Sequence, residues 1–145
     1  MNKQQYGIAW DDRLNLGDAH VDSQHKRLFE LVSELVDQCM DGSSAAKLSE
    51  TLVFLTNYTV QHFFDEELLQ IQYDFPGYKK HKQIHEDFKM EVSCLAQRYV
   101  ESGSSKELSD DVNKIIVRWL IEHIRKEDKK IGEHIKHMIA CGVEV

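Results

Sequence analysis

Apolar residues recur at alternating steps of three and four in four long segments of this 145-residue chain, which is the spacing of amphipathic α-helices. The first three stripes contain Val21, His25, Leu28, Val32, Leu35 and Cys39, then Leu48, Leu52, Leu55, Thr59, His62, Glu66 and Leu69, and then His81, His85, Phe88, Val92, Leu95 and Tyr99. The fourth stripe contains Leu108, Val112, Ile115, Trp119 and His123, and continues with Asp128, Ile131, Ile135 and Met138. No strand-like alternation is long enough to compete, so the pattern predicts an all-α fold.

Three short stretches rich in Gly or Ser separate these segments, at residues 39–47, 74–78 and 101–109. The second stretch holds Pro76, the single proline, where it cannot interrupt a helix. Gly42 and Gly103 stand where glycine commonly ends a helix, and Ser104 with Glu107 forms the pattern of a capping box. Short connections between four helices favour an up-down-up-down antiparallel four-helix bundle.

We expect one domain over residues 1–145. An extended N-terminal arm would occupy residues 1–17, the bundle about residues 18–138, and a short tail the C-terminal end.

The fourth stripe contains one irregular step, because five residues separate His123 from Asp128. One extra residue in a helical repeat predicts a π-bulge, a local i→i+5 turn that is frequent at functional sites.

Composition excludes several kinds of protein. A formal net charge of -7 disfavours nucleic acid or an anionic membrane as the main partner. The chain has no run of about 18 apolar residues and no signal-peptide core at its start, so we expect a cytoplasmic protein. Its three cysteines are far apart and form no CxxC pair, which predicts neither a disulfide framework nor a thiolate metal site. No second apolar stripe is obvious on any helix, which favours a monomer.

Seven polar residues interrupt the apolar stripes, at positions that would face the core: His25, His62, Glu66, His81, His85, His123 and Asp128. A single histidine on such a face is usually a hydrogen-bonded core residue. Seven unpaired polar groups at one level of a bundle would instead cost several kcal/mol each. A hydrogen-bond network could satisfy them, but a cation does so more directly because every one of them offers a lone pair. The sequence therefore predicts a metal site.

The ligand set also bears on the kind and number of ions. Seven donors are too many for one tetrahedral zinc, and imidazoles with carboxylates but no thiolate suit iron, among other transition metals. For two octahedral ions, five imidazoles, two bridging carboxylates and a shared oxo or hydroxo group fill all positions but one. One open position suits the binding of a small ligand.

The runs VDSQHKRLF, HFFDEE, HKQIHEDF and WLIEHIRKED, in this order and spacing, resemble the hemerythrin family, specifically the single-domain bacterial hemerythrins. The resemblance extends from about Trp10 to Ile131, nearly the whole chain. Each fragment alone is weak, but together they match the family's pattern of a lone His followed by HxxxE, HxxxH and HxxxxD.

The resemblance implies two non-haem iron ions that share an oxo or hydroxo bridge. Glu66 and Asp128 would bridge them. One iron would be completed by His81, His85 and His123, and the other, one ligand short and open to O2, by His25 and His62. The resemblance also implies an apolar O2 pocket formed by Leu28, Phe63, Trp119, Leu120 and Ile124.

The function implied is reversible O2 binding for storage, delivery or buffering, without enzymatic turnover. Two alternatives use the same site: a sensor of O2 or NO, and an enzyme that reduces peroxide or NO. A sensor would normally need an output domain, and we expect only one domain here, although the C-terminal tail could provide a contact. The predicted pocket offers no dedicated proton donor for an enzyme.

Four polar residues near the predicted ligands have plainer interpretations. Asp65 and Glu67 lie off the stripe of Glu66, so we expect them to be exposed. Asp22 is expected to cap the first helix, the alternative being that it orients nearby groups. Gln70 stands where the family often has methionine, which leaves its effect on the pocket open.

Overall fold

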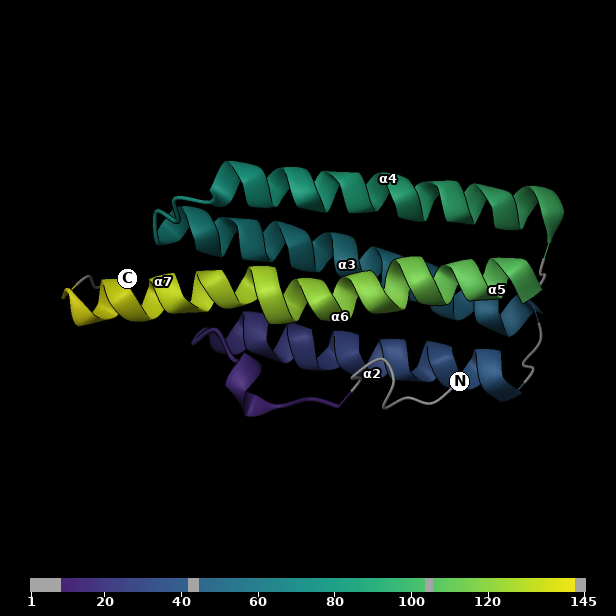
Figure 1. Cartoon of the computed structure of the whole chain (residues 1–145), viewed down its shortest axis with the longest axis horizontal. Helices are drawn as coiled ribbons and strands as arrows, with labels where there is room; N and C mark the ends of the chain where they lie inside the picture. Colours follow the sequence, from purple (N-terminus) through teal and green to yellow (C-terminus); the bar gives the residue numbers. More distant parts are fainter. Residues whose placement is uncertain (1–8, 42–44, 104–105, 143–145) are drawn as a thin grey trace.

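The computed structural model describes residues 9–41, 45–103 and 106–142. Figure 1 shows four helical rods lying side by side. Three are the single helices α2 (Ala19–Asp41), α3 (Ala45–Gln72) and α4 (Tyr78–Ser102). The fourth runs without a break through α5 (Lys106–Val112), the π-helical turn η2 (Asn113–Arg118), α6 (Trp119–His123), the π-helical turn η3 (Ile124–Asp128) and α7 (Lys129–Ala140). The predicted all-α four-helix bundle is confirmed, and the described residues contain no strand.

The packing order positions the rods around a common core. α2 packs against α3, α3 against α4, and α4 against the start of the fourth rod, so α3 lies diagonally across from that rod. Before α2, the chain makes one turn of 3-10 helix, η1 (Asp12–Leu14), between extended residues. The exact limits of the predicted domain stay a prediction, because both chain ends lie outside the described residues.

Two of the predicted helix ends can be compared with the structure. Gly103 ends α4 with a φ of 72° and donates its N–H to the Tyr99 carbonyl, as expected for a C-terminal glycine. Asp22 does not cap α2: its carboxylate accepts the N–H groups of Leu16 and Gly17, while Asp18 accepts the N–H of Val21. Asp22 therefore fixes the segment before the helix, and the prediction that it caps α2 is wrong. The glycine at position 42 and the serine at 104 lie outside the described residues.

The predicted π-bulge is confirmed, because η3 spans Ile124–Asp128. The second π-helical turn, η2, had no signal in the stripe, whose steps are regular there. Its effect is a local rotation of the buried face. Ile116 and Val117 are buried, while Ile115, which the stripe placed inward, is only half-buried.

The apolar core is divided into two clusters on either side of the polar residues. The large cluster includes Leu28 and Ile124, and the small one comprises Leu16, Val21, Leu69, Ile131 and Ile135. Along α2, His25 lies between Val21 and Leu28, and along the fourth rod Asp128 lies between Ile124 and Ile131. Apolar side chains thus cover the polar cluster from both ends of the bundle.

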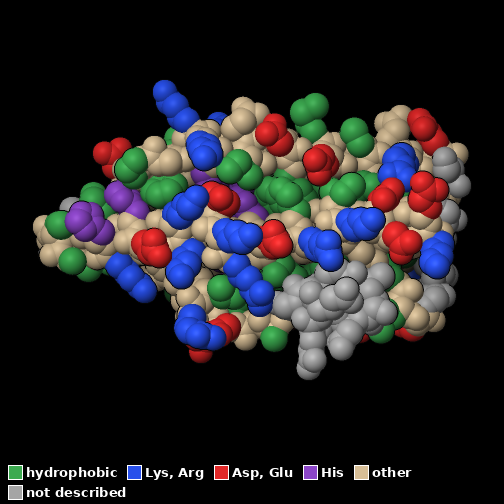
Figure 2. All heavy atoms as spheres, in the orientation of Figure 1, with side chains coloured by type: hydrophobic (Ala, Val, Ile, Leu, Met, Phe, Trp, Pro, Cys, Tyr) green, Lys and Arg blue, Asp and Glu red, His purple; other side chains and the backbone are tan. Residues whose placement is uncertain are grey.

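The fourth rod is charged on its outer face. In Figure 2, Lys and Arg side chains alternate with Asp and Glu along it. None of the described helices is long and apolar enough to cross a membrane.

Candidate metal centre

The structure brings all seven predicted polar residues together at one level of the bundle. α2 contributes one, α3 two, α4 two and the fourth rod two: His25, His62 and Glu66, His81 and His85, and His123 and Asp128. Each of the seven is 5% exposed or less. The steps of four along α3 and α4 turn both members of each pair toward the bundle axis, and the π-helical turn η3 does the same for the pair on the fourth rod.

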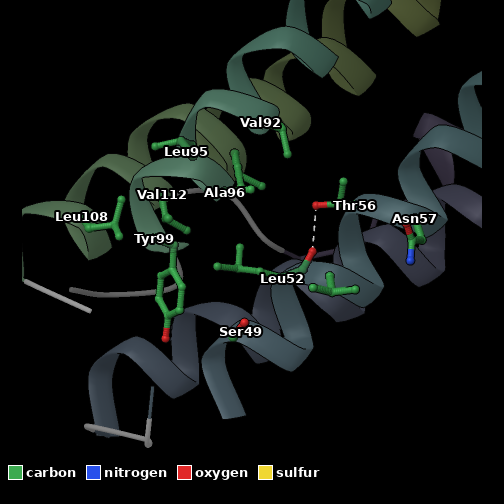
Figure 3. Close-up of a pocket in the computed structure, with 12 residues that line it drawn as sticks. Ser49, Leu52, Thr56, Asn57, Val92, Leu95, Ala96, Tyr99, Leu108 and Val112 are labelled. Carbon is green, nitrogen blue, oxygen red and sulfur yellow. Dashed lines mark hydrogen bonds between the residues drawn. The ribbon is translucent and has the colours of Figure 1, made fainter. Parts of the chain in front are cut away.

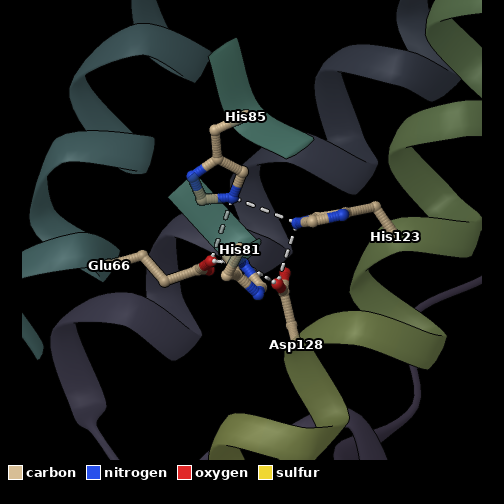
Figure 4. Close-up of side chains that lie close together, drawn as sticks. All are labelled: Glu66, His81, His85, His123 and Asp128. Atoms are coloured by element: carbon tan, nitrogen blue, oxygen red, sulfur yellow. Dashed lines mark hydrogen bonds and ion pairs between the residues drawn. The ribbon is translucent and has the colours of Figure 1, made fainter. Parts of the chain in front are cut away.

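Three imidazoles face one oxygen of each carboxylate, as Figure 4 shows. His81 Nε2 lies 2.9 Å from Glu66 Oε1 and 3.1 Å from Asp128 Oδ1. His85 Nε2 lies 3.3 Å from Glu66 Oε1, and His123 Nε2 lies 3.0 Å from Asp128 Oδ1. The ligand atoms of these five residues all lie within 4.8 Å of one another.

Two imidazoles face the other oxygen of each carboxylate. His25 Nε2 lies 2.9 Å from Glu66 Oε2 and 3.1 Å from Asp128 Oδ2. His62 Nε2 lies 3.0 Å from Glu66 Oε2. Each carboxylate therefore turns one oxygen toward a group of three imidazoles and the other toward a group of two, which is the arrangement of bridging ligands between two ions.

The contacts within the cluster are better suited to cations than to a hydrogen-bond network alone. Both oxygens of Asp128 are buried without a well-aligned hydrogen bond, although ring nitrogens lie about them. The Nε2 atoms of His85 and His123 face each other at 3.1 Å, so one must carry a proton if they bond directly. A cation on each side of the carboxylates would use every one of these lone pairs.

Proton affinities in the cluster follow from burial and from the close carboxylates. Burial opposes the charged form of His25 and His81, but the close carboxylates of Asp128 and Glu66 outweigh it and raise the pKa of each to about 10. Burial also opposes ionisation of Glu66, yet the surrounding histidines hold the pKa of its carboxyl well below the usual range. The pKa of His62 is lowered, chiefly by burial. A metal ion would therefore compete with protons for His25 and His81.

An outer layer of hydrogen bonds orients two of the imidazoles. The His85 Nδ1–H donates to Glu67 Oε2 at 2.9 Å, and the His62 Nδ1–H donates to Gln24 Oε1 at 2.8 Å. Gln24 in turn donates from its Nε2 to Asp65 Oδ2 at 2.7 Å. Because each Nδ1 carries the proton, each Nε2 is left with its lone pair directed into the cluster.

The expectation that Glu67 and Asp65 are exposed is wrong. Glu67 is 8% exposed because it lies on the flank of α3 that α4 covers, and Asp65 is half-buried between Gln24, Gln61 and His20. Both residues lie off the apolar stripe that contains Glu66, so the hydrophobic pattern did not indicate that either is buried. The buried Gln24, one residue before His25, was not identified from the sequence.

The five predicted pocket residues belong to the large apolar cluster or pack against it, and two of them stack on neighbouring histidines. Leu28, Phe63, Leu120 and Ile124 are buried, and Trp119 is half-buried. Phe63 stacks on His85 with ring centroids 3.7 Å apart, and Trp119 stacks on His123 at 4.5 Å. That any of the five contacts a bound ligand stays a prediction.

Gln70, one turn beyond Glu66, is fully buried, and its amide nitrogen and oxygen have no hydrogen-bond partner among the described residues.

Comparison with known proteins gives a consistent result. Residues 16–135 match the family model of the hemerythrin HHE cation binding domain. The chain is 32% identical over 133 residues to a bacteriohemerythrin from Pseudomonas aeruginosa, covering 92% of this chain and 84% of that protein. It is 28% identical over 122 residues to myohemerythrin from Riftia pachyptila, covering 84% and 88%. The crystal structure of a wild-type hemerythrin superposes with a TM-score of 0.72 at 24% identity, covering 86% of this chain and 95% of that one, and supports the same fold. The chain therefore belongs to the hemerythrin family.

Proposed function

We propose that this protein holds two iron ions in the buried cluster and binds O2 reversibly, as a store, carrier or buffer of oxygen. One observation carries the proposal. Glu66 and Asp128 each turn one oxygen to His81, His85 and His123 and the other to the remaining two imidazoles. When bound between these residues, two ferrous ions would supply the electrons for reversible O2 binding.

The donor set and the relatives both favour iron. Imidazole and carboxylate without thiolate suit first-row ions that accept six ligands, whereas structural zinc prefers four. The match to the hemerythrin HHE cation binding domain covers residues 16–135, which contain all seven residues of the cluster. The group with two imidazoles, His25 and His62, has one protein donor fewer, so we assign the small ligand to that side.

The chain's own contribution to reversibility is to exclude water and protons. Leu28 lies one turn after His25 along α2, and the Phe63 ring, which stacks on His85, has its centroid 6.0 Å from that of His62, so apolar groups also adjoin the two-imidazole side. None of the five pocket side chains is an acid or a base. Release of O2 in its original form requires that no proton from outside the centre reach it, because such a proton would release peroxide, and these side chains deliver none.

The outer hydrogen bonds would hold the donors in place when electrons and ligand move. Glu67 and Gln24 each accept an Nδ1–H, from His85 and His62 respectively, and so prevent rotation of the ring. Sensing of O2 or NO, and reduction of peroxide or NO, would use the same residues, and turnover assays with an electron donor separate the enzyme from reversible binding.

The test is anaerobic loading with Fe(II), followed by metal analysis, exposure to O2 and then purging with argon. We expect two irons per chain and a visible charge-transfer band that appears with O2 and disappears on purging, with the ferrous protein recovered. His62→Leu should lower the iron count, whereas His137→Leu, at an exposed histidine outside the cluster, should not change it. Immediate oxidation without a lasting O2 adduct would contradict oxygen storage and favour an enzyme or sensor.

A further inference from the structure

The outer face of α3 carries a second apolar stripe, opposite in direction to its metal-site face. Five of its side chains are between 43% and 58% exposed: Val53, Val60, Phe64, Leu68 and Ile71. With Asn57, which is also exposed, they recur at steps of three and four, so they form one continuous face of the helix. The expectation that no helix has a second apolar stripe is therefore wrong for α3.

This face also lacks charge. Residues 51–64 contain no Asp, Glu, Lys or Arg, although the chain as a whole has a net charge of -7. The outer face of the fourth rod is the opposite case, since charges of both signs cover it in Figure 2. Depletion of charge together with exposed Phe, Leu and Ile is the composition of an interface core. A second copy of the chain could approach here without bringing like charges together.

Beside the N-terminal half of the stripe, two hollows lie between α3 and α4. The first has a volume of about 230 Å³, and in Figure 3 Leu52 and Thr56 face Leu95 and Tyr99 across it. The second has a volume of about 210 Å³ and is lined by Val60 among others. Thr56 lines both, so the two hollows adjoin.

The two threonine hydroxyls that line the hollows already have partners within α3. The Thr56 hydroxyl donates to the Leu52 carbonyl and the Thr59 hydroxyl to the Leu55 carbonyl, each at 2.7 Å. An apolar side chain that entered the hollows would therefore leave neither hydroxyl unpaired.

The geometry points to a two-fold dimer in which α3 packs antiparallel against α3 of a second copy. With the axis at the level of position 62, Phe64 of one copy lies opposite Val60 of the other, Leu68 opposite Thr56, and Ile71 opposite Val53. The protruding end of each stripe then meets the hollowed end of the other. A two-fold interface uses the same patch twice, so a single face must contain both the protrusions and the hollows, as this one does.

The area is of the right order for such a dimer. The exposed parts of the five stripe residues amount to about 500 Å² per chain, and a standard interface buries roughly 600–1,000 Å² per partner. The walls of the two hollows add to the contact area. The stripe is about 27 Å long, so the contact extends over most of α3.

The test is sedimentation equilibrium of the iron-loaded chain, from about 1 to 500 μM, with circular dichroism to confirm folding of each variant. We expect a monomer–dimer equilibrium and at least a roughly 30-fold weaker association for Phe64→Glu, at the centre of the stripe. Ile139→Glu, an equally exposed apolar residue on α7, is the matched control and should leave association unchanged.

A charge pair tests the antiparallel register. Val53→Lys and Ile71→Glu should each weaken association alone, and the double variant should restore it, because each introduced charge then faces its opposite on the other copy. Within one chain these positions are about 27 Å apart along the helix, so they cannot pair internally. A wild-type chain that stays monomeric, a dimer insensitive to Phe64→Glu, or a double variant that is not restored would each overturn the proposal.

Discussion

Replacement of Glu67 by alanine is expected to weaken the binding of one metal ion without removing any residue of the inner cluster. Glu67 Oε2 accepts the Nδ1–H of His85 at 2.9 Å in a buried position. Burial alone would lower the pKa of His85, but the carboxylates of Glu66 and Glu67 outweigh it and raise that pKa above its ordinary value. Glu67 therefore makes the imidazole a stronger donor and fixes its orientation.

The expected loss follows from what each variant removes. Glu67→Ala removes both the acceptor and the charge, and loss of such an outer-layer partner typically lowers metal affinity about 10- to 100-fold, or ~1.4–2.7 kcal/mol. Glu67→Gln keeps an oxygen that accepts the Nδ1–H and removes only the charge. We expect it to lower affinity less, by roughly 3- to 10-fold.

The assay is anaerobic competition between the protein and a chromophoric Fe(II) chelator, which resolves the two binding steps. Only one step should weaken, because His85 belongs to the three-imidazole group alone. The matched control is Glu86→Gln, which removes the same charge from the neighbouring, partly exposed position of α4, where Glu86 pairs with Lys89. Equal affinity of Glu67→Ala and the wild type, or equal weakening of both steps, would refute the assigned role of Glu67.

Three further predictions concern protons, packing and water. His25 and His81 have pKa values raised to about 10, so both are protonated at neutral pH in the metal-free chain, and the binding of two metal ions must release both protons. The overall association constant for the two ions should therefore rise about 100-fold per pH unit between pH 7 and 9. Calorimetry in buffers of different ionisation enthalpy measures the number of protons released. A fall in affinity over that range would contradict it. Gly132→Ala should lower the free energy of unfolding by about 1–3 kcal/mol, because a Cβ there would lie 3.2 Å from the Leu16 Cα. Urea denaturation measures this loss. An unchanged midpoint would show that the segment containing Leu16 can move aside. Trp119→Ala removes the ring stacked on His123 and should speed irreversible oxidation of the O2-loaded protein by roughly tenfold. The rate is measured from the loss of the visible band. An unchanged rate would show that other side chains exclude water from the site.

The helices and their inner faces could be predicted because the apolar stripe along each helix consists of the residues that the helix buries. The step of five between His123 and Asp128 likewise predicted η3, because one extra residue in the helical repeat requires a local i→i+5 turn. The turn η2 could not be predicted in this way. It includes three consecutive apolar residues, Ile115, Ile116 and Val117, so a shift of the buried face by one residue leaves the hydrophobic pattern unchanged.

The inner cluster could be predicted for the same reason, because polar residues on a buried stripe have few other uses. The outer layer could not. Glu67 is buried by α4 and Gln24 by α3, so their roles depend on which helix lies beside which, and a single stripe does not contain that information. The exposed stripe of α3 was missed because residues 51–64 contain no charge on any side of the helix, so no charged face separates the exposed apolar residues from the buried ones.

The most direct measurement is anomalous diffraction at the iron absorption edge from crystals of the Fe(II)-loaded protein. Two iron peaks are predicted, both between the carboxylates of Glu66 and Asp128. One should lie within bonding distance of three imidazole Nε2 atoms, and the other within bonding distance of those of His25 and His62. A single peak, or iron bound away from these side chains, would contradict the proposed two-iron centre.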